Sequence, residues 1–64
     1  MNDYCEQIAP VLELYGSVTG LGDPQLDDAI VSDLITDLHH WCDYLGWDFD
    51  SLLQRSFSHY QAES

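Results

Sequence analysis

The side chains best suited to metal binding or catalysis lie close together in the sequence, at His39, His40, Cys42 and Asp43. All four are residue types that bind metal ions. At about 100° per residue, however, only His39 and Asp43 share a helical face, because Cys42 faces the apolar side and His40 points about 100° away. No closed set of four ligands results, so we predict no metal site. We interpret the histidines as surface residues beside carboxylates.

The remaining candidate nucleophiles and bases are Cys42, Ser56, Ser58 and His59. No nucleophile elbow or catalytic signature surrounds them, and a chain of 64 residues has little room for a pocket that excludes water. The pairs Asp33 and Asp37, or Asp48 and Asp50, resemble the general acid and base of an active site. Exposed helical aspartates, however, ordinarily only make the surface soluble. We therefore predict no catalytic residue, no cofactor and no enzyme activity.

Charge is the main functional clue. Twelve carboxylates face a single cation, Arg55, which gives a formal net charge of −11. Such a chain repels nucleic acid and anionic membrane, so we expect a basic protein as its partner. Its hydrophobic content of 45%, with 12% aromatic residues, is too high for a disordered acidic tail and predicts a folded domain.

The acidic residues are spaced along one predicted helix and continue beyond its end. Asp33 and Asp37 lie one turn apart, about 5–6 Å between side-chain roots, and Asp28 and Asp43 extend the band. DNA presents a comparable row, with one phosphate per roughly 3.4 Å on each strand. The predicted partner-binding residues are Asp28, Asp33, Asp37, Asp43, Asp48 and Asp50. A simpler interpretation is a merely soluble acidic surface, but uncompensated repulsion in a small domain favours a binding function.

The segment 26–45, LDDAIVSDLITDLHHWCDYL, must position most of these carboxylates. Its apolar residues gather on one half of a helical wheel and form the predicted core face. They are Leu26, Ile30, Val31, Leu34, Ile35, Leu38, Trp41, Cys42 and Leu45. Asp23 followed by Pro24 is a typical helix start and Gly46 a typical helix end, so we predict a helix over 24–45.

Two further helices flank this segment. Helical spacing predicts the first over 3–15, kinked or broken at Pro10, with Gly16 as its cap and residues 16–23 as a flexible connector. The third is predicted over 49–62, with Asp48 as its N-cap and Trp47 packed on Leu52 as a hydrophobic staple.

These elements predict an all-α fold, a small three-helix bundle in a single domain over 1–64. No apolar run approaches the ~20 residues that span a bilayer, and the segment MNDYCEQ is acidic where a signal peptide is basic. We therefore predict a cytoplasmic protein with no membrane partner. In a reducing cytosol Cys5 and Cys42 are expected as buried thiols rather than as a disulfide.

The string LITDLHHWCDYLGWDFDSLLQRSFSHYQAE, residues 34–63, resembles short bacterial, phage and plasmid proteins with the pattern DL-x-HWCD-x-x-G-x-DF-D-x-LL…HY-x-AE. The matching positions are Asp37, Leu38, His40, Trp41, Cys42, Asp43, Gly46, Asp48, Phe49, Asp50, Leu52, Leu53, His59, Tyr60, Ala62 and Glu63. In size, charge and helical character the chain also resembles the DNA-mimicking anti-CRISPR and anti-restriction proteins of mobile elements. That second resemblance implies a nucleic-acid-handling defence complex of a bacterial host as target, a CRISPR surveillance complex foremost.

Two functions from different classes follow. The first is a non-catalytic inhibitor whose acidic face binds the DNA-binding surface of a defence complex. The second is an adaptor or accessory module that dimerises or docks through an apolar face, for which Leu14, Val18 and Leu21 are candidates. Salt separates them, because charge-led binding weakens in salt whereas apolar docking holds or strengthens.

Overall fold

The computed structural model describes residues 2–64 and consists of three helices joined by two connections. They are α1 (Asp3–Thr19), α2 (Ala29–Leu45) and α3 (Phe49–Glu63). The predicted all-α, three-helix fold is confirmed. No helix of the described residues is long and apolar enough to cross a membrane.

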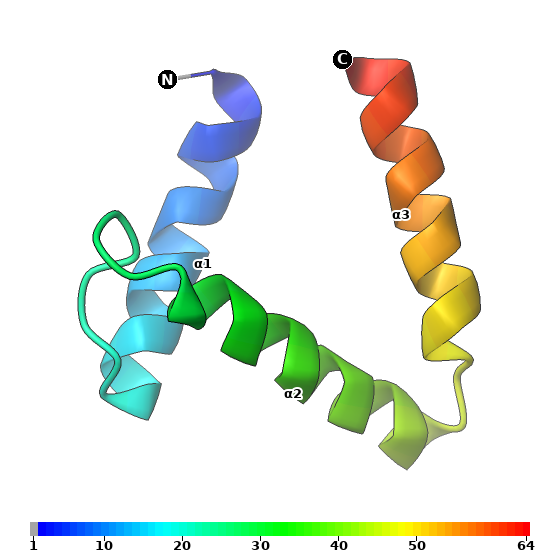
Figure 1. Ribbon diagram of the computed structural model, residues 1–64, viewed down its shortest axis with the longest axis horizontal. Coiled ribbons are helices and arrows are strands. Elements are labelled where there is room, and N and C mark those ends of the chain that lie inside the picture. Colours follow the sequence, from blue (N-terminus) through cyan, green and yellow to red (C-terminus); the bar gives the residue numbers. More distant parts are fainter. Residues whose placement is uncertain (1) are drawn as a thin grey trace.

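The helices form an open U. α1 and α3 both rise from the same side of α2, and both described chain ends lie at the open end of the U (Figure 1). Each outer helix packs on α2, whereas the backbones of α1 and α3 make no close contact within residues 2–64. The Cα atoms span 30 × 29 × 15 Å, so the fold is flat, with a shortest dimension about half of the other two.

Helix α1 is longer than predicted and is not broken. It begins where Asn2 accepts a hydrogen bond from the Cys5 amide at 2.9 Å, and it continues through Pro10 to Thr19. Pro10 lies on the exposed side, where water can bond the carbonyl that its missing N–H leaves free. A bend at Pro10 stays a prediction. Gly20, with φ 75°, replaces Gly16 as the left-handed cap.

Gly16 instead lies inside α1 and is buried. A Cβ atom built on it would stand 2.5 Å from the Gly22 carbonyl oxygen and 3.4 Å from Cδ1 of Ile30. The α1–α2 connection therefore folds back directly over this residue, and a hydrogen atom is the only side chain that fits without a shift. The predicted 16–23 connector is displaced to residues 20–28.

The predicted start of the second helix is wrong by about one turn. Asp23 accepts from the Gln25 amide at 2.9 Å, and the Asp23 carbonyl accepts from the Leu26 amide at 3.1 Å, which closes a turn instead of starting a helix. Asp27 then accepts from the Ala29 amide at 2.9 Å, and the helix begins there. Gly46 and Asp48 behave as predicted, ending α2 and capping α3.

The core is far smaller than the predicted core face. Only Ile30 and Cys42 are buried hydrophobic residues in the described chain, at 0% and 6% exposure. Leu26 lies outside the helix and is 86% exposed. Trp41, near the end of α2, and Trp47, in the connection to α3, are each 54% exposed. Cys42 is a buried thiol as expected, whereas Cys5 is an exposed one, and both are free.

Candidate functional site

Four of the predicted partner-binding aspartates lie on or next to α2. The rise of 1.5 Å per residue separates Asp28 from Asp43 by about 22 Å, so the carboxylates average one per ~7 Å along the axis. This is about half the density of phosphates on one DNA strand. The helical rotation spreads the four carboxylates over a half-cylinder, with Asp28 and Asp37 at its opposite edges.

Asp37 is the one residue of the set that ties two helices together. Its Oδ2 accepts a hydrogen bond from the Tyr15 hydroxyl of α1. That hydrogen bond, with desolvation and the negative charges of Asp37 and Asp33, raises the pKa of Tyr15 to about 12. The phenol therefore stays protonated at physiological pH and joins α1 to α2 through this hydrogen bond. Asp33, one turn away, faces no cation within residues 2–64.

Asp48 also has a structural role, as the N-cap of α3. It accepts from the amides of Asp50 at 3.1 Å and Ser51 at 3.5 Å, and from the Ser51 hydroxyl at 2.9 Å. The Ser51 hydrogen bonds lower the pKa of Asp48 below its ordinary value, because they favour the charged form. Asp50 follows in the first turn, where the helix dipole favours a carboxylate.

The remaining two aspartates are open to solvent. Asp28 stands at the cap position of α2, yet its side chain makes no capping hydrogen bond. Asp43 lies 4.0 Å from Nε2 of His39, whose ring stacks on Phe49 with centroids 4.3 Å apart. His39 and Asp43 thus share a helical face, as predicted. Within residues 2–64 no three His, Cys, Asp or Glu side chains gather closely enough to hold a metal ion.

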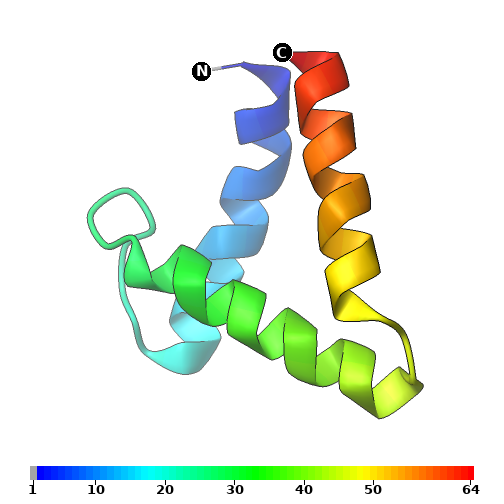
Figure 2. The ribbon, with the colours of Figure 1, turned by 45° about the vertical axis from the view of Figure 1, so that its right-hand side comes forward.

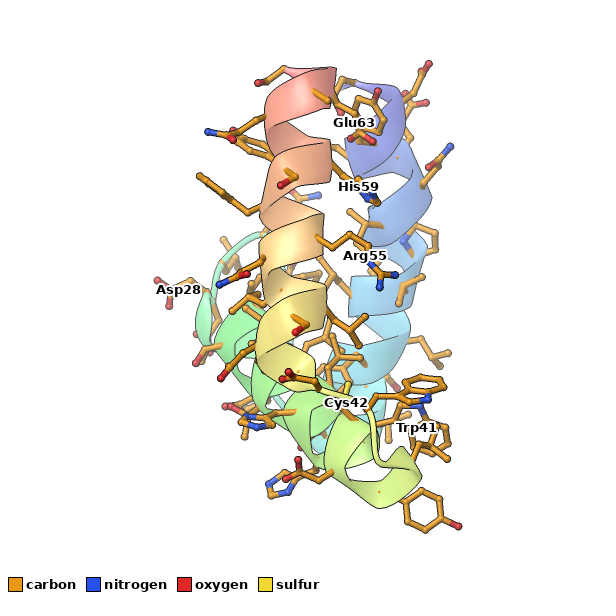
Figure 3. The ribbon with its side chains drawn as sticks, turned by 90° about the vertical axis from the view of Figure 1, so that its right-hand side faces the viewer. Asp28, Trp41, Cys42, Arg55, His59 and Glu63 are labelled. Atoms are coloured by element: carbon orange, nitrogen blue, oxygen red, sulfur yellow. The ribbon has the colours of Figure 1, made fainter. Side chains whose placement is uncertain are left out.

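Cations are nearly absent from this surface. The single basic side chain, Arg55, lies with His59 and Glu63 along one flank of α3, whereas Asp28 projects from the other side of the molecule (Figure 3). The part of the chain that the structure describes contains no ion pair between Arg55 and a carboxylate. All six aspartates are exposed, so their charge faces solvent.

Sequence reasoning located the carboxylates but missed the contact between Tyr15 and Asp37. The signal available was the phenol itself, since a tyrosine near a helix interface usually finds a hydrogen-bond partner. No protein-family model, curated protein or solved structure matches this chain.

Proposed function

We propose that this chain is a non-catalytic inhibitor that binds the basic DNA-binding surface of a bacterial defence complex and excludes DNA from it. The exposed carboxylates on α2 and at the start of α3, none of which pairs with Lys or Arg within residues 2–64, carry the proposal. An anionic helix surface of this kind takes the place of DNA phosphates against Lys and Arg side chains, and release of counterions drives the association. CRISPR surveillance complexes are the foremost target, in keeping with the resemblance to anti-CRISPR proteins.

The six aspartates divide into two groups with different roles. Asp37 and Asp48 hold the fold through Tyr15 and Ser51, so changing them alters both structure and charge. The free set, defined as Asp28, Asp33, Asp43 and Asp50, makes no side-chain hydrogen bond between helices. It is therefore the set whose removal tests binding with least effect on folding.

The test compares two variants of equal charge. In the first, the free set is changed to Asn. In the matched control, four carboxylates outside the proposed surface are neutralised as Asp3→Asn, Glu6→Gln, Glu13→Gln and Glu63→Gln. Both are used to capture partners from a lysate that carries CRISPR and restriction systems, and the captured complex is then purified and its binding to labelled duplex DNA is measured.

We expect the wild type and the control to retain a nucleic-acid-binding complex, to block its DNA binding, and to be displaced by excess duplex DNA. The free-set variant should bind at least tenfold more weakly, about 1.4 kcal/mol. Binding should fade between about 0.1 and 1 M salt, as the Debye length falls from ~10 to ~3 Å. Equal binding by both variants would mean that the surface only solubilises the chain, and the proposal would fail.

A second candidate is an adaptor that docks on another protein through an apolar face. It is favoured by Leu14 and Val18, which are 66% and 76% exposed on α1, whereas Leu21 is partly covered. Leu14→Gln should then abolish capture of the partner while the free-set variant leaves it intact, and the complex should survive high salt.

A further inference from the structure

The inner sides of α1 and α3 carry apolar side chains that no helix covers. Figure 2 shows both helices extending from α2 toward the same end of the molecule. On α1, Tyr15 bonds to Asp37 of α2, while Tyr4 lines a pocket of about 350 Å³ together with Tyr60 of α3. The helical line that joins these two tyrosines runs through Ile8 and Val11, so this line faces the inside of the U.

Helix α3 presents a matching line. Phe49 stacks on His39 of α2 and Tyr60 lines the shared pocket, so Leu53 between them also faces inward. Between the two outer helices, Leu38 lies at the middle of the apolar side of α2 and is 47% exposed. We call these residues the open face: Ile8, Val11, Leu38, Leu53 and Tyr60.

The amount of uncovered surface is large for a chain of this size. The accessible surface is 5254 Å², whereas a compact monomer of 7.3 kDa exposes about 4,200 Å². The Cα radius of gyration is 13.0 Å, against about 11 Å for a compact domain of 64 residues. The excess of roughly 1,000 Å² slightly exceeds the ~800 Å² that each partner contributes to a standard stable interface.

We propose that the open face is covered by a second copy of this chain, in a two-fold symmetric dimer. A stable domain packs its elements around a core, whereas residues 2–64 of this chain bury only two hydrophobic side chains, Ile30 and Cys42. A second copy carries the same open face, which can pack against the first. It is also present wherever the chain is made.

The charges permit this arrangement. None of the open-face residues is charged, and the aspartates of the free set lie on the outside of the U or at helix starts. Two chains of −11 nevertheless repel each other, so added salt strengthens the dimer. Salt should therefore strengthen the dimer but weaken binding to a basic partner. The dimer neither requires nor excludes the proposed function.

The experiment is sedimentation equilibrium of the full chain over a wide range of concentrations at low and moderate salt, with tryptophan fluorescence recorded in parallel. We expect a mass twice the 7.3 kDa of the chain, with a dissociation constant in the micromolar range or tighter. The emission of Trp41, half-exposed on α2, should shift to shorter wavelength as the dimer forms.

The variant Leu38→Gln should weaken the dimer at least about tenfold. Tyr44→Gln is the matched control, because Tyr44 lies about 120° around the same helix and is 79% exposed; since its ring lies 5.8 Å from that of Trp41, the two variants are compared by sedimentation alone. A chain that is helical only at dimeric concentrations would also support the proposal. A folded monomer at all concentrations, or a dimer that Leu38→Gln and Tyr44→Gln affect equally, would overturn it.

Discussion

Replacement of Gly16 by alanine tests the packing of α1 against its following connection. Two effects of known sign compete. Alanine favours a helix over glycine by about 0.8–1.0 kcal/mol, but its Cβ would stand 2.5 Å from the Gly22 carbonyl oxygen. Inserting a group into such a packed site costs about 1–3 kcal/mol. Because the opposing atom is backbone and Ile30 closes another side at 3.4 Å, we expect the clash to win by about 1 kcal/mol.

The neighbouring substitution Ser17→Ala is the control. Ser17 is exposed on the same helix, so its replacement gains about 0.5 kcal/mol of helix propensity without a clash. The two variants should therefore differ in melting temperature by about 6–12 °C. The measurement is thermal unfolding by far-ultraviolet circular dichroism at a single chain concentration. If Gly16→Ala proves as stable as Ser17→Ala, the connection moves freely and the proposed close approach is wrong.

Three further predictions concern hydrogen bonds. The raised pKa of Tyr15, about 12, means that its contribution to stability is complete below pH 10 and is lost as the pH rises towards 12, so Tyr15→Phe should flatten that alkaline loss in denaturant titrations. The lowered pKa of Asp48 acts in the acid range, because its contribution to the free energy of unfolding is present above the ordinary aspartate pKa and disappears as the pH falls below it. Asp48→Asn should remove this pH dependence, since the asparagine side chain still caps α3 but does not ionise. Asn2→Ala deletes the cap of α1 and should cost about 0.5–2 kcal/mol of unfolding free energy, whereas Gln7→Ala on the exposed side of the same helix should not.

Local signals were sufficient to predict the three helices. The 3.6-residue repeat of apolar side chains identified each helix, and Gly46 and Asp48 act through neighbours within five residues. The same kind of signal misled at Asp23 and Pro24, because an aspartate followed by proline begins a turn as readily as a helix. In this chain the turn forms, within a connection that folds over Gly16.

The extent of burial could not be predicted in the same way. Periodicity shows which side of α2 is apolar but not which helices cover it. Leu38 and Ile30 both lie on that side, yet Leu38 is 47% exposed and Ile30 is 0% exposed. The candidate site was likewise only partly predictable. The exposed positions of the six aspartates were readable from the sequence, whereas the bond from Tyr15 to Asp37 joins residues 22 positions apart and depends on how α1 crosses α2.

The arrangement in which the backbone of each outer helix packs only on α2 has a consequence for folding. All contacts between helices join neighbours in sequence, so little loop-closure entropy is lost and the contact order is low, as in domains that fold in microseconds to milliseconds. It also means that α3 can detach without disturbing the α1–α2 pair. Each end of the U is thus a separate cooperative unit, and amide exchange should be graded along the chain instead of uniform.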